Sequence, residues 1–196
     1  MGLILEDPFT GVRGRINNKG RLETESVTRV FGNFQAINGN TYNIVTNYFE
    51  LTSSNESGTI YLKSNEEHPI VISNIFLGFG PSTGGSGLLQ VKVSKNPTDG
   101  TIITAGADIT PVNRNFGSAK LLDVTAKKGA EGLTLMNGTF FERLEPTAGI
   151  VDLVDLDLVL QRGNAIGIAI TPPAGNTSIF VKTDIVCYLN NVFEEQ

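Results

Sequence analysis

The chain of 196 residues has no tryptophan and only one cysteine and one histidine. A single cysteine excludes an internal disulfide and any zinc site built from several cysteines. Cys187 lies in the apolar run TDIVCYL, so we predict that it packs in the core. A Ser-His-Asp triad or a Cys-His pair would depend on His68, which precedes Pro69 and is interpreted as a turn residue. No G-x-S-x-G motif surrounds any serine, so we predict a protein that is not an enzyme.

Long hydrophobic runs and clusters of positive charge are also missing. No stretch approaches the roughly 20 apolar residues that span a bilayer, and the opening MGLILEDPFTG is too poor in apolar residues for a secretory signal. The net charge of −5 repels a polyphosphate backbone. We therefore expect a soluble protein made in a host cytoplasm, with neither a membrane nor a nucleic acid as its partner.

Helical periodicity is almost absent, whereas short β-branched and aromatic runs separated by turn residues recur along the whole chain. We predict strands at 43–52, 57–64, 69–79 and 87–95, and then in GTIITAG, SAKLLDVTA, EGLTLMNGTFFERL, VDLDLVLQRGNAIGIAITPP and TSIFVKTDIVCYL. Asn137-Gly138 predicts a two-residue hairpin, and Gly163-Asn164 and residues 172–176 predict two further reversals. About eight to ten strands at this spacing indicate an all-β antiparallel sandwich or barrel.

The glycine-rich stretch GFGPSTGGSGLL, residues 78–89, raises the question of a phosphate-binding loop. Gly80 and Gly85 have the P-loop spacing, but Ser86 and Gly87 stand where the lysine and the hydroxyl residue are needed. The dinucleotide pattern also fails, because no amphipathic helix follows and Thr83 occupies the third glycine position. We interpret the stretch as a connection between strands whose glycines supply backbone freedom.

Two carboxylates in VDLVDLDLVL, Asp155 and Asp157, fall on one face of a predicted strand. Such a pair could hold calcium or flank a glycosidic bond, and it could equally be a solvated strand face. No third acidic ligand stands nearby, so we predict no metal site and no cofactor.

Sugar-binding sandwiches depend on aromatic platforms, and here the aromatic residues stand in apolar strand contexts, which disfavours a lectin. We predict that the following phenylalanines fill the core: Phe76, Phe79, Phe116 and Phe180.

The first 35 residues are polar and charged and form a separate part of the predicted organisation. They are interpreted as an N-terminal arm or a small hairpin, followed by a β-sandwich over residues 36–191 and a short tail over 192–196. Five of the 15 Lys and Arg residues stand in this first part: Arg13, Arg15, Lys19, Arg21 and Arg29.

The segment LDLVLQRGNAIGIAITPPAGNTSIFVKTDIVCYLNN, residues 156–191, resembles the closing strands of jelly-roll structural proteins of tailed bacteriophages. Residues 110–144 are similar to the middle of such proteins, and VRGRINNKGRLETESVT is similar to the N-terminal arms of virion accessory proteins. The resemblance implies a jelly-roll sandwich with an extended N-terminal arm. It also implies a head decoration or cement protein, a homotrimer on the capsid surface of the virion.

In that family the partner is the major capsid protein, with no small-molecule substrate. The five basic residues of the arm would then contact acidic surface on that protein, and the trimer would strengthen the shell. A different function stays open on the same fold: a receptor- or glycan-binding head domain of a phage fibre, which would use the loops at one end of the sandwich.

Overall fold

The computed structural model describes residues 4–6, 13–16, 22–25, 35–80, 82–144, 149–153 and 158–190. The chain divides into two compact units, Met1–Phe34 and Gln35–Gln196. The second unit is the body of the protein.

The N-terminal unit contains a three-stranded antiparallel sheet in the order β1 (Ile4–Glu6), β2 (Arg13–Ile16) and β3 (Leu22–Glu25). The register sets Arg13 opposite Glu25 on one side and Glu6 on the other, and it sets Arg15 opposite Glu23. Opposite charges at facing positions favour strand pairing. Two of the basic residues singled out in the sequence therefore stand at positions that face acidic residues of the same unit.

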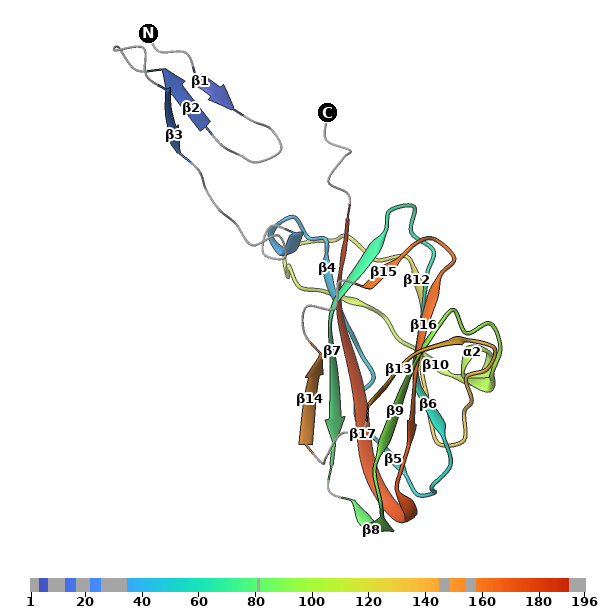
Figure 1. Cartoon of the computed structure of the whole chain (residues 1–196). Helices are drawn as coiled ribbons and strands as arrows, with labels where there is room; N and C mark the ends of the chain where they lie inside the picture. Colours follow the sequence, from blue (N-terminus) through green and yellow to red (C-terminus); the bar gives the residue numbers. More distant parts are fainter. Residues whose placement is uncertain are drawn as a thin grey trace. The chain divides into compact units, whose positions relative to one another are not determined.

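The body contains two antiparallel sheets that face each other (Figure 1). The first contains β4 (Thr41–Val45), β5 (Phe49–Leu51), β7 (Ile70–Phe79), β8 (Thr83–Ser86), β11 (Val112–Asn113), β14 (Gly149–Leu153), β15 (Leu158–Leu160) and β17 (Ala174–Leu189). The second contains β6 (Ser57–Ser64), β9 (Gln90–Lys95), β10 (Ala107–Asp108), β12 (Val124–Lys128), β13 (Thr139–Leu144) and β16 (Ala165–Thr171).

The strand order identifies the type of sandwich. The first sheet runs β4-β17-β7-β14, with β15 also on β7, and the second runs β6-β16-β9-β13. Along the chain, the strands of these two series alternate between the sheets, except that β9 and β13 both belong to the second sheet and β14 and β15 both belong to the first. This is the order of a jelly roll, in which two Greek keys fold over each other. The predicted fold class, an all-β antiparallel sandwich of jelly-roll type, is confirmed.

The core lies between the two sheets and follows the alternation of the strands. In β17 the buried positions Ile179, Val181, Ile185 and Cys187 alternate with outward positions such as Phe180. They pack against Ile60, Leu62, Val91, Ile168 and Ile170 from the other sheet. The prediction that Cys187 packs in the core is confirmed. Within the described residues, no helix has the length and hydrophobicity to cross a bilayer.

The segment between β9 and β13 adds a third layer over the outer face of the second sheet. Its short helix α2 (Thr101–Ala105) and the loop between β12 and β13 bring Ile102 and Leu135 onto Tyr61, Ala165 and Ala169. A Cβ at Gly167 would lie 2.8 Å from Leu135 Cδ1, so glycine lets this layer approach the sheet.

The prediction of a strand in GTIITAG is wrong. Burial of Ile102 and the bonds that join Thr101 to Thr134 outweigh the β propensity of its residues.

The predicted hairpin at Asn137-Gly138 is also wrong. Asn137 does adopt a positive φ of 58°, but the residues before it form only an isolated bridge between Met136 and Asp99. β13 pairs with β9 instead, over the register Thr139–Leu144 to Lys95–Val91. Pairing with this longer ladder in the sandwich outweighs the local turn preference.

Glu131 fastens the loop after β5 to the third layer. Its carboxylate accepts hydrogen bonds from the backbone N–H of Thr52 and Ser53, at 2.9 and 2.6 Å, and from the Thr52 hydroxyl at 2.8 Å. Hydrogen bonding, above all from the Thr52 side chain, lowers the pKa of Glu131 below its ordinary value. A depressed pKa in the folded state means that the carboxylate stabilises the fold above the unfolded-state pKa, and that this contribution is lost as the pH falls through the folded-state value.

We therefore expect Glu131→Gln to lower the urea midpoint of unfolding at about pH 7, and we expect the difference from the parent to be smaller at about pH 3. Urea denaturation of both proteins at the two pH values measures the effect. Glu67→Gln is the control, because the ion pair of Glu67 with Arg162 is long, at 3.7 Å, and both side chains are exposed. A midpoint difference that is equal at both pH values would contradict the role of the carboxylate.

Candidate interaction surface

The glycine-rich stretch forms a strand connection, as the sequence predicts. Within it, β8 pairs with the beginning of β17, with Ala174 opposite Ser86 and Asn176 opposite Gly84. Gly84 and Gly85 have φ values of 69° and 82°, which side chains rarely adopt. A Cβ at Gly84 would also lie 2.8 Å from the carbonyl oxygen of Gly175. These glycines are therefore explained by the close approach of two strands.

The residues considered for catalysis or metal binding do not assemble into a site in the part of the chain that the structure describes. Cys187 is fully buried, and burial raises the pKa of its thiol to about 12, so the thiol is neutral at physiological pH. No group of three or more His, Cys, Asp or Glu side chains that could hold a metal occurs among the described residues. Asp155 and Asp157 lie outside the described residues.

The basic residues proposed for partner binding are only partly placed. Arg13 and Arg15 stand in β2, at the positions facing Glu25 and Glu23. Lys19, Arg21 and Arg29 lie outside the described residues.

Two of the four phenylalanines predicted in the core lie on the surface, so the prediction is wrong for them. Phe79 is buried and Phe76 is half-buried, but Phe116 is 96% exposed and Phe180 is 45% exposed. Phe180 follows the outward phase of β17, between the buried Ile179 and Val181. Phe116 stands in the loop after β11, where no strand turns it toward the core.

Phe116 belongs to a group of exposed apolar side chains at the β11 edge of the first sheet. We call this group the β11 patch. The other members are Ile37, which is 62% exposed, Val112, 57%, and Leu121, 82%. Exposed apolar groups of this kind mark contact sites more often than isolated surface residues do.

Hydrogen bonds from two asparagines hold the segments of the β11 patch together. The Asn113 amide donates to the backbone carbonyl of Gly39 at 2.8 Å and to that of Lys120 at 3.2 Å. The Asn115 amide donates to the Ile37 carbonyl at 2.8 Å, and its side-chain oxygen accepts from the Gly117 N–H at 3.0 Å. Phe116 is therefore displayed from a loop whose backbone is fixed on both sides.

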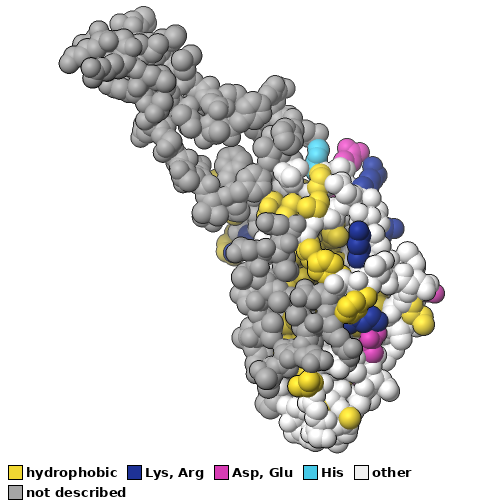
Figure 2. Space-filling view, in the orientation of Figure 1, with side chains coloured by type: hydrophobic (Ala, Val, Ile, Leu, Met, Phe, Trp, Pro, Cys, Tyr) yellow, Lys and Arg dark blue, Asp and Glu magenta, His cyan; other side chains and the backbone are white. Residues whose placement is uncertain are grey.

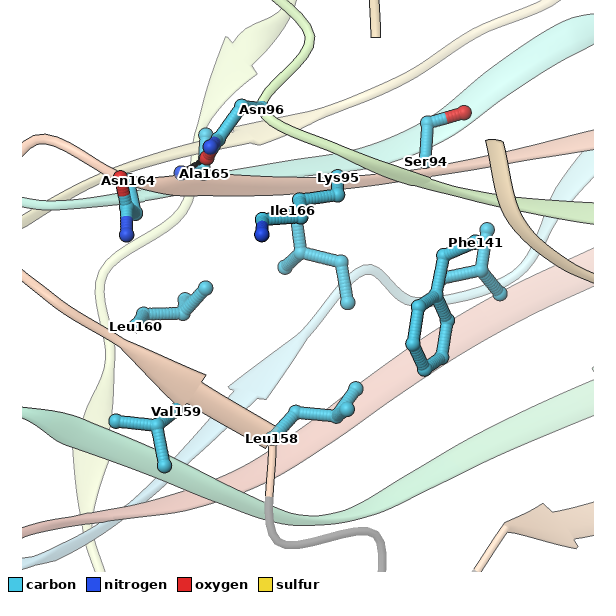
Figure 3. Close-up of a pocket in the computed structure, with 11 residues that line it drawn as sticks. Ser94, Lys95, Asn96, Phe141, Leu158, Val159, Leu160, Asn164, Ala165 and Ile166 are labelled. Atoms are coloured by element: carbon cyan, nitrogen blue, oxygen red, sulfur yellow. Dashed lines mark hydrogen bonds between the residues drawn. The ribbon is translucent and has the colours of Figure 1, made fainter. Parts of the chain in front are cut away.

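A pocket of about 180 Å³ lies at the opposite edge of the first sheet, between β15 and the second sheet (Figure 3). Phe141, Leu158, Leu160 and Ile166 give it apolar walls, and Ser94, Lys95, Asn96 and Asn164 are polar residues of its lining. Phe141 is half exposed and stands at a β-bulge in β13, where the register against β9 shifts. Bulges re-aim side chains, and this one gives the pocket an aromatic wall.

Charges of both signs are interspersed on the described surface. Figure 2 shows several separate groups of hydrophobic side chains on one face, with Lys, Arg, Asp and Glu between them. Exposed ion pairs such as Lys92 with Glu56 at 3.2 Å add to this mixture.

Neither the β11 patch nor the pocket was predicted from the sequence. The loop sequence NRNFGS carries a usable signal for Phe116, because a phenylalanine flanked by turn-forming Asn and Gly lacks the alternating neighbours of a core strand. The pocket has no local signal, since its walls come from four separate strands.

No known protein-family model matches the sequence, and no curated protein sequence matches it. Among solved structures, the chain is similar to one from T=1 particles derived from infectious bursal virus, with 10% sequence identity and a TM-score of 0.19. The similarity covers 94% of this chain and 47% of that one, so the present chain spans about half the length of the chain it matches. At this TM-score the likeness assigns neither a family nor a function.

Proposed function

We propose that the chain is a non-enzymatic structural protein of a phage virion, a decoration or cement protein that binds the major capsid protein and stabilises the shell. The observation that carries this proposal is the β11 patch: apolar side chains held in the open by a fixed loop are suited to contacts between protein subunits, as expected of a protein that acts by assembly. The resemblance of residues 110–144 and 156–191 to phage jelly-roll proteins supports the choice of a capsid as the partner. The protein acts at the capsid surface, by adhesion alone.

In this proposal the N-terminal unit contacts the shell, and the body supports contacts between copies. The register of β2 with its neighbours changes the expected chemistry of that contact. Arg13 and Arg15 stand at positions opposite acidic residues of their own sheet, so this unit brings charges of both signs to the contact.

Deleting residues 1–30 is expected to abolish capsid binding and to leave a folded body. The body has its own core and strand network from residue 35 onward, so its circular dichroism and its cooperative unfolding should be retained. Binding is measured by co-sedimentation with capsids that lack the protein. The full-length chain is the positive control.

Capsid binding that persists after the deletion would exclude the N-terminal unit as the attachment site. Absence of binding by the full-length chain to any capsid lattice would exclude the proposed function itself.

A further inference from the structure

Phe116 and the pocket stand at opposite edges of the first sheet, at the same level. Asn113 in β11 faces Tyr42, Tyr42 faces Cys187, Cys187 faces Ile72, and Ile72 faces Leu158 in β15. One row of paired residues thus crosses five strands, from the loop that carries Phe116 to the wall of the pocket. Four strand spacings make this row about 19 Å long. Among the described strands, β11 pairs only with β4 and β15 only with β7.

The pocket has the size and lining for one phenyl ring. An apolar cavity of about 150 Å³ in another protein binds benzene, and this pocket of about 180 Å³ has Phe141, Leu158 and Ile166 in its walls. It is smaller than the roughly 300 Å³ at which small-molecule sites begin. The space fits a single side chain from a protein better than a free ligand.

We propose that Phe116 of one copy inserts into this pocket of a second copy, so that the β11 edge of one body docks beside the β15 edge of the next. Phe116 is 96% exposed on a fixed loop, so its insertion buries a large apolar ring at little cost in backbone order. The same ring cannot reach the pocket of its own chain, because the row between them spans about 19 Å.

The contact is head to tail, since the two partners use different surfaces. Repetition of such a contact makes a ring when the rotation between copies closes. The proposal concerns copies of this chain alone and does not depend on capsid binding.

The test measures the mass of the full chain by light scattering and sedimentation over a range of concentrations. The parent should form a closed oligomer, and Phe116→Glu and Phe141→Glu should each raise its dissociation constant by about 30-fold or more, as loss of a buried aromatic anchor does. Phe180→Glu and Phe140→Glu are the matched controls, because these rings are 45% and 54% exposed and do not line the pocket. The controls should assemble as the parent does.

Mixing the two defective variants distinguishes head-to-tail docking from a general loss of folding. Phe116→Glu keeps an intact pocket and Phe141→Glu keeps an intact Phe116, so the mixture should form a one-to-one dimer that neither variant forms alone. A mixture that stays monomeric overturns the proposal, as does a parent that is monomeric at every concentration or a Phe116→Glu protein that assembles normally.

Disulfide cross-linking is a second test of the contact between Phe116 and the pocket. An oxidised mixture of Phe116→Cys and Phe141→Cys should yield a disulfide-linked dimer of one copy of each, because buried Cys187 does not compete. Absence of that cross-link, or equal cross-linking of each variant with itself, overturns the proposal.

Discussion

Gly129→Ala is expected to lower the free energy of unfolding by about 3 kcal/mol, the upper end of the range for overpacked sites. Gly129 lies where the third layer meets β6, and its backbone N–H donates to the Thr59 carbonyl at 2.8 Å. A Cβ at this position would lie 2.6 Å from the carbonyl carbon of Gly58 and 2.9 Å from the Cα of Thr59. These atoms belong to the backbone of a central strand, so the clash cannot be relieved by a side-chain rotation.

Urea denaturation followed by circular dichroism measures this loss. Gly117→Ala is the matched control, since the nearest atom to a Cβ there, Asn115 Oδ1, is 3.5 Å away and the backbone is not in the left-handed region. We expect the control to change stability by less than about 0.5 kcal/mol. Equal stability of the two alanine variants would show that the third layer is not held against β6 as described.

Thr59→Val is expected to lower the free energy of unfolding by about 2 kcal/mol, although valine and threonine have nearly the same shape. Thr59 and Thr183 are both fully buried, one in each sheet, and their hydroxyl oxygens lie 3.0 Å apart. Thr59 donates to the Ile168 carbonyl at 3.1 Å, so the Thr183 hydroxyl donates to Thr59. Replacing Thr59 therefore leaves a buried hydroxyl and a buried carbonyl without this partner.

A double-mutant cycle separates this link from the volume of the side chains. Thr183→Val should lower the free energy of unfolding by about 1 kcal/mol, because the Thr59 hydroxyl still donates to the Ile168 carbonyl. The double variant should lose about 2 kcal/mol of unfolding free energy, which is less than the sum of the two single losses, because no unpaired hydroxyl remains between the sheets. Strictly additive losses would show that the two hydroxyls do not stabilise each other across the core.

The strands of the sandwich were predictable because their residues alternate, and alternation reports which face is buried. In β9 the sequence QVKVSK places Val91 and Val93 inward, and β17 repeats the pattern from Ile179 to Leu189. The elements that the sequence misassigned are those decided by distant partners. The Thr101–Ala105 segment is rich in β-branched residues, but it forms a helix in which Ile102 packs against Tyr61 and Leu135.

The candidate interaction surface was less predictable than the fold for a similar reason. Phe116 is apolar, so composition alone assigns it to the core, and only its Asn and Gly neighbours argue otherwise. The pocket draws its walls from Val93, Phe141, Leu158 and Ile166, which the chain brings together only after both sheets have formed. Sequence patterns within one segment do not show which distant residues come together. The register between strands does show it, and this register relates the position of the pocket to that of Phe116.

The position of β17 has a consequence for how the protein is made. This last strand of the body lies inside the first sheet and pairs with β4, β5, β7 and β8. Those four strands therefore cannot pair with β17 until the ribosome has synthesised residues 174–189. Pairings that join such distant parts of a chain close slowly. Synthesis of nearly the whole body thus precedes its folding, and the nascent chain carries exposed strand edges during that interval.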